Sequence, residues 1–210
     1  MKNNYDNIAN LYDFLSRLFF LKTQVKAQVE ILKYIKANST ILIVGGGSGW
    51  ILEELAKLHH EGLVIDYVEI SEKMLNRSKK RDYKKNNVFF FRTAIEDFRS
   101  INSFDVIITA FLFDNFLEEK ADKVFNLLNK QLRSAGNWLY TDFYVDPRKD
   151  SSWKRWLLAI MYKFFRYICD VEADKLVNME KYFKNSGYTE IKHSSHYLGF
   201  IKGIVYRKNR

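Results

Sequence analysis

The chain has 210 residues, 47% of them apolar and including 17 Phe and 13 Tyr, which provides enough core for one α/β domain with additional helices but not for two independent domains. Its single cysteine, Cys169, excludes an intrachain disulfide framework and a cysteine-based zinc cluster. The formal net charge of +9 admits an acidic partner, but the basic run 77–85 is expected at the end of a helix, where solvated cations complement the helix dipole.

Two helices are predicted within residues 1–37, and neither has the apolar segment of a secretion signal or a membrane span. We therefore expect a cytoplasmic protein. The apolar residues of the two helices recur at helical spacing: Ile8, Leu11, Leu15 and Leu18, then Val25, Val29, Leu32 and Ile35.

Residues 40–144 alternate between predicted strands and helices. The strands are expected at 40–44, 63–70, 88–91, 104–109 and 137–144, and the helices at 50–58, after the N-cap Ser71 and at 117–132. Because a strand, a crossover helix and the next strand form a right-handed unit, this order predicts a parallel sheet.

Residues 145–187 are expected to form a helical lid or insertion, which includes the apolar segment 153–169 and a helix at 173–184. Two further strands, 188–194 and 198–207, are separated by three residues, a connection that permits only an antiparallel hairpin. The expected architecture for residues 1–210 is a single α/β domain, a Rossmann-like three-layer sandwich. Its seven-stranded, mostly parallel sheet has an antiparallel C-terminal strand.

The first strand runs directly into the turn Gly45-Gly46-Gly47-Ser48-Gly49. Glycine permits unusual dihedral angles and lets the backbone approach a ligand, although packing alone also places glycines at the start of helices. Glu69 ends the next strand, 24 positions after Gly45, near the roughly 20 at which an acidic residue accepts hydrogen bonds from ribose hydroxyls. The pattern predicts a cofactor that contains a nucleoside.

A nicotinamide dinucleotide fits this pattern poorly. Its fingerprint, G-x-G-x-x-G, would require glycine at position 50, where the chain has Trp50. The antiparallel hairpin at the end of the chain also disfavours an all-parallel dinucleotide fold, and no phosphate-binding G-x-x-x-x-G-K-[ST] loop occurs.

Four segments carry a family resemblance: YDNIANLYDFLSRL at 5–18, VGGGSG at 44–49, SFDVIITAFLFDNF at 103–116 and LYTDFYVDP at 139–147. With these motifs the sequence resembles the class I S-adenosylmethionine-dependent methyltransferases, and within them the ubiquinone/menaquinone biosynthesis C-methyltransferase group. The resemblance spans most of the chain.

The resemblance implies S-adenosylmethionine as the cofactor and no metal. It places the glycines around the methionine and ribose, Glu69 at the ribose, residues 70 and 94–95 at the adenine, and residues 110–111 near the sulfonium. Two tyrosines of the first helix would close the site, with ordinary amphipathic packing as the alternative. The implied cofactor residues are Tyr5, Tyr12, Gly45, Gly46, Gly47, Gly49, Glu69, Ile70, Ala94, Ile95, Ala110 and Phe111.

Two positions depart from the family pattern. Many members have an acidic residue two positions before the first glycine, where this chain has Ile43, and an aspartate after the third strand, where it has Thr93. The first change removes a partner for the methionine ammonium, and the second an acceptor for the adenine amino group. Glu96 or Asp97 is a candidate replacement for the latter.

Methyl transfer from a sulfonium is an in-line displacement without a covalent enzyme intermediate, so the protein mainly aligns the reactants and no obligatory catalytic motif is expected. A carbon or oxygen nucleophile would also need a base. The candidates are Asp142, Asp114, His193 and His196. A structural or solvated role is the alternative for each.

The segment 153–169, WKRWLLAIMYKFFRYIC, is apolar but interrupted by four cations, and its longest uncharged interior run, 156–162, has seven residues. It is too short to cross a bilayer. Three interpretations remain: a lid over an apolar acceptor, an interfacial helix with peripheral membrane contact, and a helix packed on the flank of the sheet. The first favours a small, apolar or aromatic acceptor.

Two further functions stay open. An RNA or protein methyltransferase would use the positive charge, but no N-P-P-[YF] tetrad or appended RNA-binding module occurs, so a nucleic-acid partner is not expected. A non-catalytic cofactor-fold binding protein is suggested by Ile43 and Thr93. The sequence does not determine the acceptor, the methylated atom or the oligomeric state.

Overall fold

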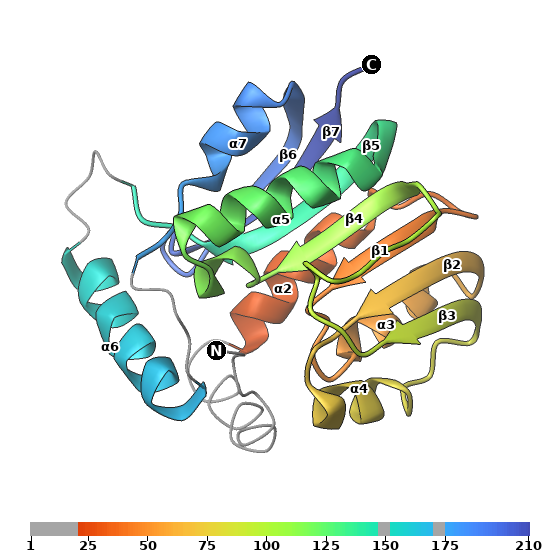
Figure 1. The fold of residues 1–210 in the computed structure, drawn as a ribbon, viewed down its shortest axis with the longest axis horizontal. Helices are drawn as coiled ribbons and strands as arrows, with labels where there is room; N and C mark the ends of the chain where they lie inside the picture. The colour runs from red at the N-terminus through yellow and green to blue at the C-terminus, as the bar shows by residue number, and fades with distance from the viewer. Residues whose placement is uncertain (1–20, 147–151, 170–174) are drawn as a thin grey trace.

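The computed structural model describes residues 21–146, 152–169 and 175–210 (Figure 1). A seven-stranded sheet in the order β3-β2-β1-β4-β5-β7-β6 forms the middle layer. The strands are β1 Thr40–Val44, β2 Glu61–Val68, β3 Lys85–Phe91, β4 Phe104–Ala110, β5 Leu132–Phe143, β6 Tyr188–His196 and β7 Ile201–Lys208. Neighbours from β3 to β5 are parallel, whereas β7 is antiparallel to both β5 and β6.

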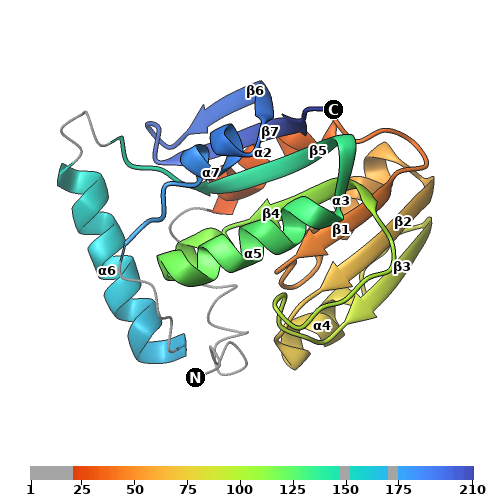
Figure 2. The same ribbon diagram turned by 45° about the horizontal axis from the view of Figure 1, so that its top comes forward.

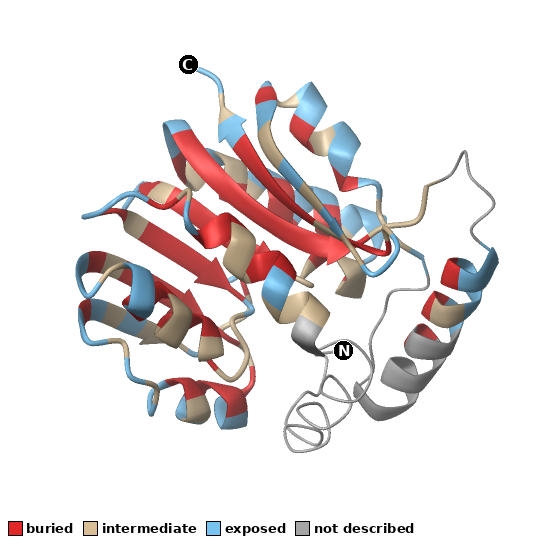
Figure 3. Cartoon of the chain, turned by 180° about the vertical axis from the view of Figure 1, so that it is seen from behind, coloured by how far each residue is buried: buried red, intermediate tan, exposed pale blue. Residues whose placement is uncertain are grey.

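Helices cover both faces of the sheet (Figures 1 and 2). The core of one face involves α2 Leu21–Leu32, α3 Trp50–Leu58 and α4 Glu72–Ser78, and that of the other involves η2 Phe113–Asn115, α5 Glu118–Gln131 and α7 Met179–Asn185. Side chains of β1 alternate between the two cores: Ile41 and Ile43 face α3, and Leu42 and Val44 face α5. Because successive strand residues point to opposite faces, a strand covered on both sides is buried along its length, as Figure 3 shows for the central strands.

Helix α6, Ser152–Cys169, lies at the periphery of the molecule, on the side toward which β4 and β5 point (Figures 1 and 2). Its buried residues Leu158 and Tyr162 belong to a third apolar cluster that also contains Phe143 and Phe200. The carboxyl ends of β4 and β5 therefore adjoin an apolar surface supplied partly by this helix.

The register of the sheet aligns the ends of the parallel strands. Val44 is paired with Val68 on one side and with Thr109 on the other, and Val68 is paired with Phe91. The residues that follow, including Gly45 and Glu69, consequently lie along one edge of the sheet. In an open α/β sheet, ligands bind outside this edge where the strand order reverses, and here the reversal is between β1 and β4.

The predicted α/β sandwich with its antiparallel C-terminal strand is confirmed, and Ser71 caps α4 through a hydrogen bond from the Met74 amide to its Oγ (3.3 Å). Some predicted boundaries were wrong. Strand β5 begins at Leu132, directly after α5, because a register irregularity opposite β4 lets Gly136 lie inside the strand. Strand β2 begins at Glu61 and ends at Val68.

Further differences concern helices and the final hairpin. Helix α7 covers only Met179–Asn185, and residues 175–178 are not helical. The hairpin turn includes residues 198–200, which were predicted as strand. In α2, Ala27 and Ile31 are buried while Val25 and Val29 are half-buried, because the helix packs on β7. The first predicted helix, with Tyr5 and Tyr12, lies outside the described residues.

Candidate functional site

The glycine turn after β1 lies at the reversal point of the sheet. The Gly45 amide donates a hydrogen bond to the Val68 carbonyl (2.9 Å), which ties the start of the turn to the end of β2. Gly45 is exposed, and Gly46 and Gly47 are half-buried. A Cβ atom at Gly47, where φ is +60°, would have no atom within 4 Å. The backbone thus faces open space at this point of the turn.

Glu69 lies beside the turn, with its carboxylate directed toward it. Oε2 accepts a hydrogen bond from the Gly47 amide (2.9 Å), and Oε1 accepts one from the Ser71 amide (2.8 Å). The side chain is 7% exposed. The carboxylate therefore lies between the residues that follow β1 and β2, the location in which the sequence predicted a ribose-binding acid.

Tyr67 packs against the glycine turn and forms a hydrogen bond to it, a role that the sequence analysis missed. Its fully buried ring lies against Gly46, where a Cβ atom would be 2.3 Å from the ring, and its hydroxyl donates to the Gly47 carbonyl (2.9 Å). Burial, and next the charge of Glu69, raise the pKa of Tyr67. The phenol is neutral at physiological pH and is thereby kept as a donor to the turn. An aromatic residue in a buried strand carries no sequence signal for this contact.

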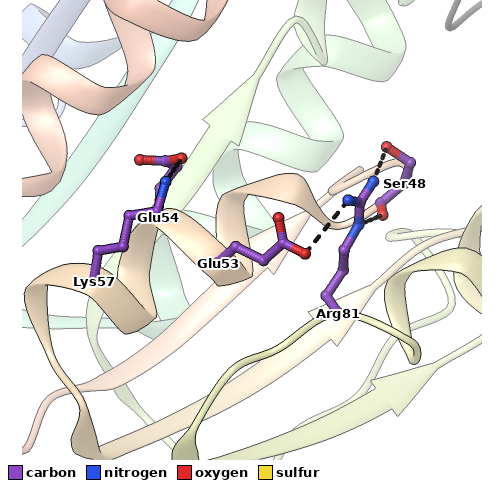
Figure 4. A network of polar contacts seen from close by, with 5 residues as sticks. All are labelled: Ser48, Glu53, Glu54, Lys57 and Arg81. Atoms are coloured by element: carbon purple, nitrogen blue, oxygen red, sulfur yellow. Dashed lines mark hydrogen bonds and ion pairs between the residues drawn. The ribbon is translucent and has the colours of Figure 1, made fainter.

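Arg81 also departs from its expected role as one solvated charge of the run 77–85. Figure 4 shows its guanidinium reaching back to the turn, where Nε donates to the Ser48 carbonyl (2.9 Å) and Nη1 lies 3.4 Å from Oε1 of Glu53. Its side chain is 31% exposed, so water screens the charge pair with Glu53. Because a carbonyl with an unsatisfied lone pair is costly, the Ser48 contact is the more important one.

The end of β4 forms the opposite wall of the crevice. Ala110 and Phe111 are half-buried there, and Phe111 has a positive φ of 52°. Two hydrogen bonds hold this disfavoured conformation: the Phe111 amide donates to the Thr141 carbonyl (2.8 Å), and its carbonyl accepts from Nδ2 of Asn115 (2.8 Å). Strain of this kind at a strand end is typical of functional sites.

Aromatic and aliphatic side chains continue from Phe111 toward α6. The ring centroids of Phe111 and Phe143 are 5.0 Å apart, as are those of Phe143 and Phe200. Leu158 and Tyr162 of α6 belong to the same cluster. We refer to these five side chains as the aromatic wall. It joins the ends of β4 and β5 to the start of β7 and to α6.

Asp114 and Asp142, the predicted bases, are brought together at the ends of β4 and β5. Asp142 is 2% exposed, and its Oδ1 accepts a hydrogen bond from the Phe143 amide (2.8 Å). Burial, and next the charge of Asp114, raise the pKa of Asp142 far above its ordinary value. Burial also raises the pKa of Asp114, to about 7. Asp114 consequently titrates near neutral pH, and its charge disfavours ionisation of Asp142.

The predicted adenine residues follow β2 and β3. Ile70 and Ala94 are half-buried, whereas Ile95 is buried in the core. The Ala94 carbonyl accepts hydrogen bonds from the Thr93 hydroxyl (3.2 Å) and the Phe98 amide (3.1 Å). Thr93 thereby fixes the local backbone.

The structure also shows where the residue at one departure from the family pattern, and the candidate replacements for the other, lie. Ile43 is 1% exposed and packs in the core with α3, so it has no access to the crevice. Glu96 pairs with Lys120 (2.8 Å), and Asp97 is exposed.

The histidines are not part of this arrangement. His193 and His196 lie on β6, at the far edge of the sheet, with β4, β5 and β7 between them and β1. His193 is 3.3 Å from Glu190 and His196 is 3.2 Å from Glu30. Three strands therefore separate both side chains from the strand that leads into the glycine turn. Across the described residues, no three His, Cys, Asp or Glu side chains gather as a metal site.

Comparison with known families gives one match. Residues 41–136, which include β1, the glycine turn, Glu69 and Asp114, match the model of a methyltransferase domain. A comparison with curated proteins finds 29% identity over 120 residues with the cytoplasmic leucine–tRNA ligase of Dictyostelium discoideum. This match covers 54% of the chain but only 11% of the ligase.

Solved structures share the fold. An N-methyltransferase, NodS, of Bradyrhizobium japonicum WM9 in complex with S-adenosyl-L-homocysteine aligns with a TM-score of 0.63 and 14% identity, covering 89% of this chain and 84% of that one. A Haloferax volcanii structure, of the Trm112 methyltransferase activator in complex with a methyltransferase, aligns with a TM-score of 0.73 and 11% identity over 100% of both chains. The family model thus indicates a methyltransferase domain within residues 41–136, and the solved structures share its fold. The quinone-biosynthesis subgroup stays a prediction.

Proposed function

We propose that this protein is an S-adenosylmethionine-dependent methyltransferase and that it acts on a small, apolar or aromatic acceptor. The observation that carries the proposal is the aromatic wall beside Phe111, at the end of β4. Aromatic surface stabilises an apolar acceptor by removing it from water, and aromatic rings prefer tilted or edge contacts of the kind that Phe111 and Phe143 already make.

The glycine turn and Glu69 supply the cofactor side of the proposal. The open space at Gly47 admits a ligand against the backbone. A carboxylate can accept about four hydrogen bonds, so Glu69 can bind ribose hydroxyls beside the amides of Gly47 and Ser71. The cofactor, when bound, supplies an activated methyl group on a positively charged sulfur.

The chain's own residues would orient the acceptor and handle its proton. Phe111, the half-buried residue of the aromatic wall, would contact the acceptor at the end of β4, and the buried side chains of the wall would exclude water. If the acceptor atom is a hydroxyl or an acidic carbon, that atom gains the methyl group and gives up one proton. Asp114 is the carboxylate suited to receive it, because a base works best with a pKa near the working pH. Asp142 is then a positioning residue.

Calorimetry of S-adenosylmethionine and S-adenosyl-L-homocysteine tests the cofactor site. We expect wild-type binding, and loss of binding in Gly47→Val, because the added side chain occupies the open space beside the turn. Gly187→Val is the matched control, since Gly187 also has a positive φ (+73°) and open surroundings but lies beyond α7. Both variants carry similar backbone strain.

Equal affinity in wild type and Gly47→Val would contradict the proposed site. Absence of wild-type binding at millimolar cofactor would favour a non-catalytic protein, in line with the buried Ile43. For the acceptor, lipid and quinone-like extracts incubated with the protein and cofactor should yield an apolar product that gains one methyl group by mass spectrometry. A methylated RNA or protein as the sole product would contradict the proposed acceptor class.

A further inference from the structure

Large apolar side chains are exposed together at one end of the molecule. Among the residues that the structure describes, eight such side chains are exposed, and four of them form one group: Trp153, Trp156, Tyr197 and Leu198. We call these four residues the aromatic patch. Trp156 is 67% and Leu198 is 86% exposed. Apolar residues that are exposed in a group, rather than singly, mark an interaction surface.

Two distant segments form the patch. Trp153 and Trp156 lie in the first turns of α6, three positions apart and therefore neighbours on the helix surface. Tyr197 and Leu198 lie in the turn between β6 and β7. The ring of Trp153 lies 6.1 Å from that of Tyr197 and 5.9 Å from that of Phe200, so the two segments are in contact.

The backbone of the turn keeps Leu198 in water. Tyr197 and Leu198 have φ values of 48° and 53°, in the left-handed region that is unfavourable for side chains larger than glycine. Hydrogen bonds from the Gly199 amide to the His196 carbonyl (3.1 Å) and from the Phe200 amide to the Tyr197 carbonyl (3.0 Å) close the turn. A strained turn with an apolar tip contributes nothing to the core and is the pattern expected of a contact surface.

The charged residues of helix α6 have one sign. Its 18 residues include Lys154, Arg155, Lys163 and Arg166 and no Asp or Glu. Lys154 is only 8% exposed, whereas Arg155 is exposed. Leu158 and Tyr162 of the same helix pack on the body of the protein.

We infer that the aromatic patch docks on the surface of an anionic lipid bilayer. Tryptophan and tyrosine are favoured at the boundary between headgroups and acyl chains, and cations on the same helix are attracted to anionic headgroups. The complementary charge of α6 selects a lipid surface over a basic partner. The contact is peripheral, because no described helix has the length and apolar character to cross a membrane. Docking needs neither cofactor nor acceptor and is independent of the proposed methyl transfer.

Vesicle co-sedimentation of the full chain, without cofactor, tests the inference. Binding is expected to mixed phosphatidylcholine–phosphatidylglycerol vesicles, to weaken with salt, and to be much lower for phosphatidylcholine alone. The double variant Trp156→Ser/Leu198→Ser should bind roughly tenfold more weakly, since two exposed apolar anchors are lost. Arg155→Glu should also weaken binding to the anionic vesicles.

The matched control is Ile101→Ser/Phe89→Ser, which removes two exposed apolar side chains from outside the patch. All four positions are exposed, so the variants should fold, and circular dichroism checks this. Control binding equal to wild type, with loss in the patch variant, supports the inference. Equal binding by wild type and the patch variant, or no wild-type binding to anionic vesicles, overturns it. Self-association that the patch variant abolishes also overturns it, because the patch would then bind a second copy.

Discussion

The carboxyl pair of half-buried Asp114 and buried Asp142 gives a specific prediction about stability and pH. Burial raises the pKa of Asp114 from the usual 3.8 to about 7, and burial together with the Asp114 charge raises that of Asp142. A carboxyl group with a raised pKa binds its proton more tightly in the folded protein than in the unfolded chain. The stabilisation that this tighter proton binding gives the folded protein is therefore complete below pH about 4. It is lost as the pH rises through the folded-state pKa.

The size of the effect follows from Asp114. A pKa change from 3.8 to about 7 corresponds to about 4 kcal/mol at about 1.4 kcal/mol per pKa unit. The free energy of unfolding should thus decrease by up to about 4 kcal/mol between pH about 4 and 8, a large part of the 5 to 15 kcal/mol typical of a folded domain. Urea denaturation followed by circular dichroism, repeated across this pH range, measures it.

Asp142→Asn is the decisive variant. Its carboxamide oxygen can still accept the hydrogen bond from the Phe143 amide, while the second buried charge is gone. Stability should depend less on pH, and the variant should be more stable than wild type at pH 8 by at least about 1 kcal/mol. Asp122→Asn, at an exposed position of α5, should follow the wild-type curve. If the Asp142→Asn curve runs parallel to wild type, the two carboxyl groups do not share a buried environment.

Three further variants test the glycine turn. Gly46→Ala should lower the free energy of unfolding by about 1 to 3 kcal/mol, because its Cβ would lie 2.3 Å from the buried Tyr67 ring. Thermal denaturation measures this loss. The double variant Gly46→Ala/Tyr67→Leu should recover part of the lost stability. Glu69→Gln should lower the free energy of unfolding by about 1 to 3 kcal/mol, because an amide NH2 would face a backbone donor. Calorimetry should also show weaker cofactor binding by this variant. Unchanged cofactor affinity would exclude a ribose-binding role for Glu69. Arg81→Met should lower cofactor affinity with little change in stability, because the Ser48 carbonyl loses its hydrogen-bond donor at a partly exposed position. Cofactor affinity equal to that of wild type would argue that Arg81 does not position the glycine turn.

Local sequence signals determined the fold and the cofactor side of the candidate site. The apolar run at 40–44 followed by glycines predicted a strand and a turn, and the structure has both at those positions. Glu69 was recognised from its place at the end of a predicted strand, 24 positions after Gly45, and the structure places it beside the turn. Periodicity and glycine placement act over a few residues, so a single sequence displays them directly.

Only the tertiary structure decided which distant residues support that turn and what lies opposite it. Tyr67 looks like any aromatic residue of a buried strand, and Arg81 like one cation among many, until packing brings them to Gly47 and Ser48. The ionisation of Asp114 and Asp142 likewise depends on burial and mutual distance, quantities that a linear pattern does not encode. The sequence alone thus specified the succession of strands and helices along the chain and the bare backbone for a ligand. The contacts that hold that backbone and tune the acids arise from side chains far apart along the chain, and only folding brings them together.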